Sequence, residues 1–384
     1  MKVLHIIESL GRGGAEALLV NLLPALNKIG VECHVAVLNP PHDLSKALTN
    51  SNVKVHHLNI SNRWNIPQAL ISISKLIRKE KFDIIHSHLF FSSFYSGLSK
   101  LFYFNAKRIT TFHNLGYNSY PANTLWKKIR KKIDSIIHNY LIDEQIGVST
   151  AVQKHYASHL NLRSVGMIPN CVNVPQKPLD SKSGRSQLLN TFDINPDSFI
   201  ILSPGRLVHE KGHRFSFTAL RILKEKGYHP HLLIYGNGPL KNQLEIEVEH
   251  EELKNQVHFH PAVNQAELYE AMSGADLILM SSTHEGWPLV AAETLGLALP
   301  LLATRVGAMP DIVENGVSGL LVEPKDPAAI ADAIEWLITH PEASKEFGQA
   351  GREHILNNFT PEILARIWCD YYHTLLKKTS TKKP

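Results

Sequence analysis

The sequence predicts an α/β protein with two domains, each a parallel β-sheet with helices on both faces. The chain has 384 residues, well above the common size of about 100–150 residues for one domain. Short apolar runs rich in valine and isoleucine alternate with amphipathic stretches of helical period, and this alternation occurs twice. Such an order is typical of parallel sheets whose strands are joined by helices.

Eleven apolar runs predict the strands, and each is followed by a turn and a helix-like segment. Their length and their valine and isoleucine content favour buried strands over helices. In the first half they cover residues 2–7, 32–38, 53–58, 82–86, 107–112 and 144–148. In the second half they cover residues 199–203, 231–235, 256–260, 275–280 and 299–303.

A polar stretch with two prolines separates the two halves. It can bury little apolar surface, so we expect the interdomain linker at residues 173–183. The first domain would then cover residues 1–172 and the second residues 184–359. A last helix, residues 361–376, carries Trp368, Tyr371 and Leu375 at helical spacing.

Composition excludes several classes of protein. A hydrophobic content of 43% and a charged content of 20% are ordinary for a water-soluble globular chain. The formal net charge of +5 is too small to indicate nucleic-acid binding. Glu8 and Glu16 interrupt the N-terminal apolar run, which disfavours a signal peptide, and no stretch reaches the ~18 apolar residues of a spanning helix. Three widely spaced cysteines fit a reducing, cytoplasmic compartment.

A glycine-rich turn, residues 11–16, directly follows the first strand and opens a helix. Glycine lets the backbone approach a ligand, and the free amides of a helix start attract an anion. Glu16 stands where a dinucleotide-binding turn has its third glycine, so an NAD site is disfavoured. The alternative is a tight turn without a ligand.

A second cluster, residues 203–212, also follows a strand at the start of a helix. Its Arg206 and Lys211 could converge on one anion, arginine as a planar fork and lysine as a point charge. This pattern favours a diphosphate site. The alternative is an exposed loop with two unrelated cations.

The third cluster, residues 281–293, is the most specific. Pro288 suits the first turn of a helix, so the amides of 287–290 would lie at a helix N-terminus. Glu285 precedes this helix and Glu293 lies within it, so that the two carboxylates could reach different parts of one extended ligand. A half-buried Glu293 needs hydrogen-bond partners, and a ribose diol would supply two. The alternative is a solvated glutamate.

Two further patterns are weaker. The pairs His86/His88 and His258/His260 have strand-alternate spacing that could face a metal, but no third ligand is recognisable, and we expect no metal. The segment 126–137 has Trp126, Ile129, Ile133, Ile136 and Ile137 on one helical face with five cations beside it. This face could dock on an anionic membrane or pack on its own domain, and the two are compatible.

Short motifs follow one another along nearly the whole chain. They are Gly-Gly-Ala-Glu at 13–16, the segments 83–88, 111–113, 147–149 and 168–170, Gly-Arg-Leu at 205–207, Glu-Lys-Gly at 210–212, the segment 235–239, and the two glutamates of 285–293. Any one of them is weak, whereas their joint order is specific. In this order they resemble the retaining glycosyltransferases of family 4.

The resemblance implies a GT-B fold, in which two Rossmann-like α/β/α domains face each other across a deep interdomain cleft. The first domain would bind the acceptor and the second the nucleotide sugar, with the last helix packing back on the first domain. His113 and Glu285 would be catalytic, and Glu293 would bind the donor ribose. Gly286 and Trp287 would bind the sugar, and the donor diphosphate would be held by Gly14, Arg206, Lys211, Leu289 and Val290.

The resemblance further implies transfer of a sugar from a UDP- or GDP-sugar, with retention of anomeric configuration. The acceptor would be a glycan or a lipid-linked intermediate of cell-surface polysaccharide synthesis. Fixed cations and helix-end amides would stabilise the charge that grows on the diphosphate, so no metal or other cofactor is expected. We expect a cytoplasmic enzyme with peripheral contact at the inner face of the membrane. The alternatives are a sugar-nucleotide isomerase of the same architecture and a non-catalytic nucleotide-sugar-binding protein.

Overall fold

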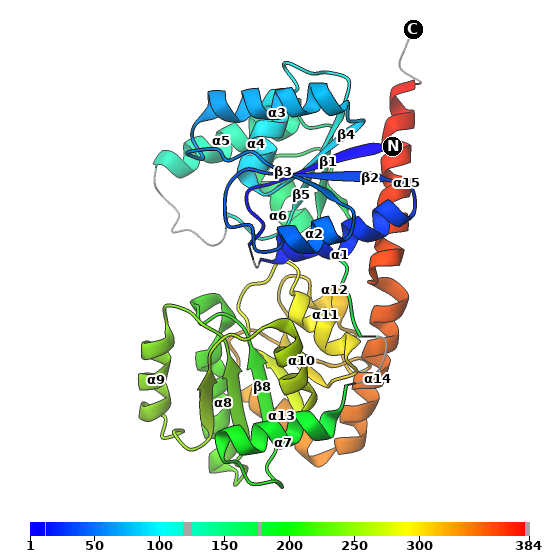
Figure 1. Ribbon diagram of the computed structural model, residues 1–384. Helices are drawn as coiled ribbons and strands as arrows, with labels where there is room; N and C mark the ends of the chain where they lie inside the picture. The colour runs from blue at the N-terminus through cyan, green and yellow to red at the C-terminus, as the bar shows by residue number, and fades with distance from the viewer. Residues whose placement is uncertain (12, 118–124, 176–178, 381–384) are drawn as a thin grey trace. The chain divides into compact units, whose positions relative to one another are not determined.

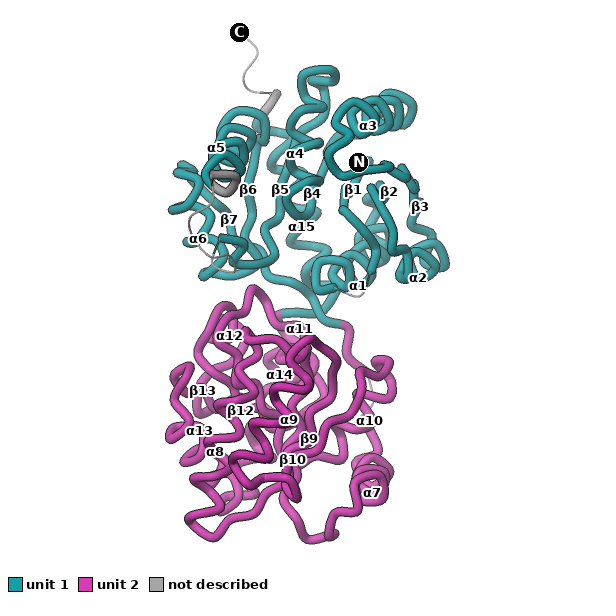
Figure 2. Tube along the Cα trace, turned by 90° about the vertical axis from the view of Figure 1, so that its left-hand side faces the viewer, with its two compact units in different colours: residues 1–172, 359–384 teal, residues 173–358 magenta. Residues whose placement is uncertain are grey.

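The computed structural model describes residues 1–11, 13–117, 125–175 and 179–380 (Figure 1). The chain divides into two compact units (Figure 2). Unit 1 comprises Met1–Val172 and Phe359–Pro384, and unit 2 comprises Asn173–Asn358. The C-terminal segment is tied to unit 1 where the amide of Val172 donates to the carbonyl of Phe359, at 2.9 Å.

Unit 1 contains a seven-stranded parallel sheet in the order β3-β2-β1-β4-β5-β6-β7. Because β1 lies between β2 and β4, the chain reverses its direction of travel across the sheet at this point. The strands are β1 (Lys2–Ile7), β2 (Glu32–Val37), β3 (Lys54–His57), β4 (Ile84–His88), β5 (Lys107–Phe112), β6 (Glu144–Gly147) and β7 (Gly166–Met167).

Helices bury both faces of this sheet. One face packs on α1, α2 and α15, and the other on α3 and α4. Trp368 and Tyr372 of α15 are almost fully buried, which makes the C-terminal helix part of the unit 1 core. The helices are α1 (Gly14–Lys28), α2 (Ser45–Asn50), α3 (Ile66–Glu80), α4 (Phe90–Ser99), α5 (Leu125–Tyr140), α6 (Thr150–Leu160) and α15 (Pro361–Ser380).

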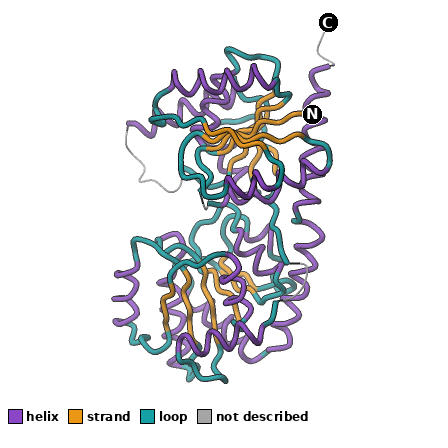
Figure 3. The backbone as a smooth tube through the Cα atoms, in the orientation of Figure 1, coloured by secondary structure: helices purple, strands orange, loops and turns teal. Residues whose placement is uncertain are grey.

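Unit 2 repeats this architecture of strands with helices around them (Figure 3). Its parallel sheet has six strands in the order β10-β9-β8-β11-β12-β13. Helices α8, α9 and α13 pack on one face. The strands are β8 (Ile200–Pro204), β9 (His231–Tyr235), β10 (Val257–His260), β11 (Leu277–Met280), β12 (Leu301–Thr304) and β13 (Leu320–Val322). The helices are α7 (Ser181–Phe192), α8 (His213–Glu225), α9 (Lys241–His250), α10 (Gln265–Ser273), α11 (Leu289–Gly296), α12 (Met309–Ile312), α13 (Pro327–Thr339) and α14 (Pro341–Asn358), with the 3₁₀ turn η1 (His209–Lys211).

The predicted α/β class is confirmed, and all eleven predicted strands occur with bounds shifted by a few residues at most. Two edge strands, β7 and β13, were not predicted because they have only two and three residues. Residues 173–183, predicted as linker, already include the start of α7, whose N-terminus is capped where the Asp180 carboxylate accepts the amides of Lys182 and Ser183. No helix within the described residues is long and apolar enough to cross a membrane.

The packing of α15 generates a stability prediction. Trp368→Ala removes a ring that is 1% exposed and should destabilise unit 1 by about 3–5 kcal/mol. Ile367→Ala, at a neighbouring side chain that is 42% exposed, should cost well under ~1 kcal/mol. Amide hydrogen exchange in α1, which packs on α15, reports both effects. Equal exchange rates in the two variants would contradict this role of Trp368.

Candidate active site

Three charged residues that the sequence predicts for the donor site lie in loops where parallel strands of unit 2 end. Arg206 follows β8 in an exposed loop, and Lys211 closes the 3₁₀ turn that leads into α8. Glu285 and Trp287 lie in the loop after β11, and Leu289 begins α11. β8 and β11 are parallel neighbours in the sheet, so their following loops meet at the same edge.

Backbone contacts lock these two loops together. The amide of Thr283 donates to the carbonyl of Glu210 at 2.7 Å, and the Ser281 hydroxyl lies 3.2 Å from the carbonyls of Lys211 and Gly212. Gly212 has a φ of +67°, and a Cβ there would lie 2.1 Å from the Ser281 carbonyl oxygen. Only glycine fits this position, because a side chain would collide with the neighbouring backbone.

An ion pair connects the same loops through their side chains. Lys211 Nζ lies 2.6 Å from Glu285 Oε1, and the Ser282 hydroxyl donates to that oxygen at 2.7 Å. The two charged side chains are 20% and 11% exposed. The Coulomb attraction is therefore stronger than at the open surface, and removing one partner would leave the other largely buried and unpaired.

The structure thus brings Lys211 to Glu285, a contact that the sequence does not predict. Arg206 is exposed in the loop just before Lys211. Gly307, with a φ of +56°, packs against the other side of Glu285, where a Cβ would lie 1.9 Å from its carbonyl oxygen. The carboxylate is therefore positioned by its backbone as well as by Lys211 and Ser282.

Helix α11 places the remaining predicted donor residues. Leu289 and Val290 form its first turn, where backbone amides have no carbonyl partner earlier in the helix. Trp287 is buried beside this turn, and Gly286 precedes it. The first turn therefore offers amides to an anion at the positive end of the helix.

Glu293 lies farther along α11 and is half-buried. Burial raises the pKa of its carboxyl above the usual value, and hydrogen bonds from Tyr269 and Gln265 oppose that rise. Gln265 Nε2 donates to Glu293 Oε1 at 2.9 Å. The predicted need for hydrogen-bond partners is therefore met in part by α10, and the carboxylate retains capacity for further donors.

Unit 1 holds two of the predicted site residues, each at the carboxyl end of a strand. Gly14 begins α1 and is exposed. Close to it, Glu16 faces the hydroxyl of Ser9 at 3.3 Å, and burial raises the pKa of that glutamate. His113 follows β5.

His113 ends a chain of imidazoles inside unit 1. Its Nε2 lies 3.0 Å from His88 Nδ1, and His88 Nε2 lies 3.1 Å from His5 Nδ1. Burial lowers the pKa of His5 and of His113 to about 3 and keeps the pKa of His88 well below its usual value. These rings are therefore neutral, and His113 Nδ1 has no hydrogen-bond partner among the described residues.

Within the described residues, one group of three side chains is close enough to share a metal. It joins His86 and His88 of β4 to His5 of β1, which the parallel register places opposite His86. Both ring nitrogens of His86 already contact hydroxyls, those of Tyr372 and Thr111, at 2.7 Å each. The cluster is therefore a hydrogen-bonded core network.

The second histidine pair that the sequence offered, His258 and His260, does not converge on one point. His258 contacts His231 at 3.2 Å, whereas His260 faces the Pro261 carbonyl at 2.9 Å.

A cavity of about 320 Å³ adjoins His113 within unit 1. His113 is the only one of its lining residues that the sequence singled out for chemistry. The others relevant to ligand binding are Glu8, Arg63, Phe90, Phe91, Tyr117, Arg130, Asp134 and His138. Asp134 and His138 could have been found from their spacing of one helical turn in α5.

Two family models match the chain. A model described as Glycosyltransferase Family 4 matches residues 12–176, and one described as Glycosyl transferases group 1 matches residues 185–354. Together they span nearly the whole of both units. The chain belongs to the glycosyltransferases of family 4.

Relatives of this glycosyltransferase match either the whole chain or about half of it. An uncharacterised 41.2 kDa protein in the cps region of Klebsiella pneumoniae is 23% identical over 97% of this chain and 99% of its own. The capsular polysaccharide biosynthesis glycosyltransferase CapM of Staphylococcus aureus is 28% identical over 48% of this chain and 49% of its own.

Solved structures show the same fold. HepE of Anabaena, in complex with UDP, has a TM-score of 0.80 at 17% identity, covering 97% of this chain and 100% of HepE. Sucrose-phosphate synthase from Thermosynechococcus elongatus has a TM-score of 0.79 at 20% identity, covering 98% of this chain and 99% of the synthase chain. At these identities the likeness concerns the fold alone, and the transferase has the GT-B fold of two Rossmann-like domains.

The buried imidazoles predict a pH dependence of stability. In the unfolded chain each takes a proton below about pH 6.5, whereas in the folded chain His5 does so only near pH 3. The unfolded state therefore binds more protons, and stability present above pH 6.5 is lost as pH falls. Between pH 7 and pH 5 the loss should be about 2 kcal/mol for His5.

His5→Gln should reduce this loss by that amount, and His373→Gln, at an exposed position of α15, is the matched control. Urea unfolding of unit 1 at the two pH values measures both. A wild-type pH dependence in His5→Gln would show that His5 is not kept neutral by the fold.

Proposed function

We propose that this glycosyltransferase moves a hexosyl unit from a UDP- or GDP-sugar to a glycan or lipid-linked acceptor. The observation that carries the proposal is the Lys211–Glu285 pair, in loops that also carry exposed Arg206, at the strand ends of a unit that matches a glycosyltransferase family model. HepE, which shares the fold, binds UDP and UDP-glucose. The name of CapM and the genomic setting of the Klebsiella relative support cell-surface polysaccharide as the product class.

In this proposal unit 2 binds the donor. Arg206 and Lys211 hold the diphosphate together with the amides of Leu289 and Val290, and Glu293 accepts hydrogen bonds from the ribose hydroxyls. As the bond to the transferred sugar breaks, negative charge grows on the diphosphate, and these preorganised groups stabilise it. The positive charge of two side chains and the free amides of a helix N-terminus already neutralise the diphosphate, so a bound metal is unnecessary.

Lys211 and Glu285 change partners when the donor binds. The donor diphosphate carries two negative charges, whereas Glu285 carries one and its Oε1 already accepts from the Ser282 hydroxyl, so the diphosphate competes for Lys211 Nζ. Glu285 then accepts hydrogen bonds from hydroxyls of the sugar, beside Gly286 and Trp287. The ion pair keeps both side chains in place before the donor arrives.

Unit 1 takes the acceptor and contributes His113 as a catalytic group. Its Nδ1 has no hydrogen-bond partner within the part of the chain that the structure describes, and the side chain lines the cavity. We propose retention of anomeric configuration through a front-face path. In that path the bond from the sugar to phosphate breaks, the bond to the acceptor oxygen forms on the same face, and the departing phosphate oxygen takes the acceptor's proton.

The nucleotide site predicts specific losses of affinity. Lys211→Ala and Glu293→Ala should each weaken binding of UDP or GDP by about 1.5–3 kcal/mol, because each loses charge-assisted hydrogen bonds. Lys241→Ala, at an exposed lysine of unit 2, is the control and should bind as wild type does. Isothermal titration calorimetry measures all three and also identifies the base. Wild-type affinity in both site variants would reject the assignment.

Incubation with a panel of UDP-, GDP- and ADP-sugars tests the reaction class. Slow hydrolysis of one donor in the absence of acceptor is the expected result for a transferase. An altered sugar with the diphosphate intact would instead indicate an isomerase, and binding without turnover a sensor.

We further propose that the enzyme works at the cytoplasmic face of an anionic membrane and contacts it through α5. Ile129, Ile133 and Ile136 are 39%, 38% and 47% exposed on one side of this helix, while Ile137 is buried. The apolar face therefore does not pack wholly on its own domain.

Charged side chains flank these isoleucines. The side chain of Trp126 lies outside the described residues. Exposed Lys128, Lys131 and Lys132 flank the isoleucines, a pattern that suits anionic headgroups.

Cosedimentation with liposomes tests this contact. The wild type should bind vesicles containing phosphatidylglycerol at low salt and release at high salt, since each cation contributes about 1 kcal/mol. Ile133→Ser with Ile136→Ser should reduce binding several-fold, whereas Ile71→Ser, at an exposed isoleucine of α3, should not. Absence of binding by the wild type at low salt would overturn the idea.

A further inference from the structure

We infer that the cavity of unit 1 selects an anionic acceptor, a sugar ring that carries a carboxylate or a phosphate. This inference rests on the proposed function, because it names the acceptor class of the same transfer. The cavity of about 320 Å³ is at the lower end of the range of ligand sites, about 300–1,000 Å³, and suits a small ring rather than a long chain. The charged side chains of the cavity, and its polar atoms without a partner among the described residues, indicate what kind of ring it binds.

Two guanidinium groups line the cavity without a carboxylate partner among the described residues. Arg130 of α5 lies 4.0 Å above the ring of Phe90, and Arg63 lies 5.7 Å from the centre of the Phe91 ring. Aromatic faces hold a guanidinium in place and leave its N–H groups available. Each arginine can therefore still donate to an oxyanion.

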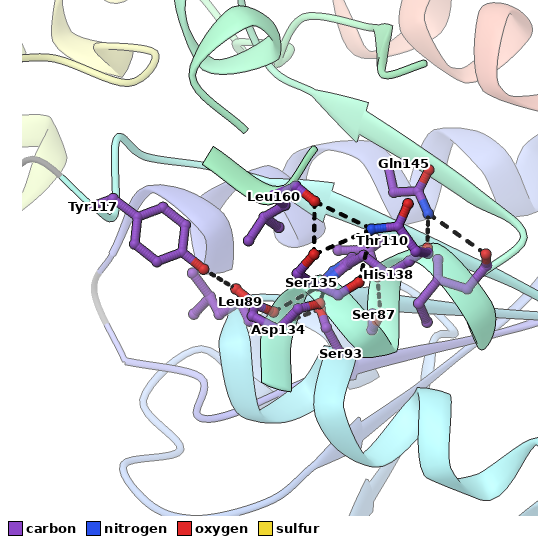
Figure 4. A network of polar contacts seen from close by, with 12 residues as sticks. Ser87, Leu89, Ser93, Thr110, Tyr117, Asp134, Ser135, His138, Gln145 and Leu160 are labelled. Atoms are coloured by element: carbon purple, nitrogen blue, oxygen red, sulfur yellow. Dashed lines mark hydrogen bonds and ion pairs between the residues drawn. The ribbon is translucent and has the colours of Figure 1, made fainter. Parts of the chain in front are cut away.

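Both carboxylates of the cavity, in contrast, have protein partners. Glu8 Oε1 accepts the amide of Phe91 at 3.0 Å. Asp134 accepts the hydroxyl of Tyr117 and lies 3.0 Å from His138 Nδ1, as Figure 4 shows. Each carboxylate keeps its negative charge but already accepts a hydrogen bond, whereas neither arginine has a carboxylate partner among the described residues. The hydrogen-bond donors left over in the cavity are therefore cationic guanidinium groups, which favour an oxyanion as the ligand.

His138 supplies a site for the ring itself. Its Nδ1 faces two oxygens, the carboxylate of Asp134 and the carbonyl of the same residue at 2.8 Å, so this nitrogen carries hydrogen. In the neutral ring Nε2 is then an acceptor. That Nε2 is buried without a partner among the described residues, and the side chain lines the cavity. A ligand hydroxyl would satisfy it.

The aromatic walls complete the match to a sugar. Phe90, Phe91, Phe112 and Tyr156 give the cavity flat apolar faces beside its few polar groups. A pyranose ring presents both C–H faces and hydroxyls, and such a combination of surfaces is typical of small-ligand sites. The oxyanion of the sugar would bind the two arginines at one end of the ring, and a hydroxyl of the same sugar would face the histidines.

Titration of the full-length protein with three single-ring probes tests this inference. Ligand-observed NMR measures binding of methyl glucuronide, glucose 1-phosphate and methyl glucoside. We expect at least one anionic probe to bind about tenfold or more tightly than the neutral glucoside. Preference for the glucuronide would identify a uronic-acid acceptor, and preference for the phosphate a phosphate-linked one. Equal binding of all three, or binding of none, would overturn the proposal.

Variants assign the binding to the cavity. Arg63→Gln and Arg130→Gln should each weaken the preferred anionic probe about tenfold. Lys128→Gln, at an exposed cation of the same helix as Arg130, is the control and should not. His138→Gln should weaken the same probe several-fold, with circular dichroism verifying the fold. Wild-type affinity in both arginine variants would overturn the assignment.

Binding of UDP, measured on the same samples, separates the two proposals. In all of these variants it should equal that of the wild type, because none of the changed residues lies in unit 2. Failure of the wild type to bind any nucleotide would reject the proposed function. Intact nucleotide binding with no preference for anionic rings would reject the acceptor class alone.

Discussion

Burial of both faces of two parallel sheets is the constraint on which the rest of the molecule depends. Strands such as β4 and β11 have every residue buried, so a polar ligand cannot bind along them. Turns at the carboxyl ends of the strands are the positions left for chemistry. Gly14, His113, Lys211 and Glu285 all lie in or next to such turns, each after a different strand.

Within unit 2, glycines allow these turns to approach closely, and the approach brings a lysine and a glutamate into contact. Gly212 and Gly307 bring backbone segments together at distances that no other residue allows. The loops so joined hold Lys211 against Glu285, a cation whose present partner can be exchanged for phosphate. In unit 1 the carboxyl edge of the sheet instead carries neutral imidazoles and a cavity in which two arginines have no carboxylate partner among the described residues.

The sequence predicts the fold well because each buried strand is an apolar run between turn residues. It also places Arg206, Lys211 and Glu285 in loops after the correct strands. It does not predict the Lys211–Glu285 pair, since the two residues are 74 positions apart and only the adjacency of β8 and β11 joins them. His5 was missed for the same reason, because only the parallel pairing of β1 with β4 brings it opposite His86 and next to His88. The state of His138 depends on side-chain geometry that spacing does not encode.

The most direct test of the account is a crystal structure of the protein with UDP. We expect the diphosphate within hydrogen-bonding distance of Lys211 Nζ and of the Leu289 and Val290 amides, with the ribose on Glu293. Lys211 should then have exchanged Glu285 for a phosphate oxygen. UDP bound elsewhere, with the Lys211–Glu285 contact still at its present 2.6 Å, would contradict the central claim.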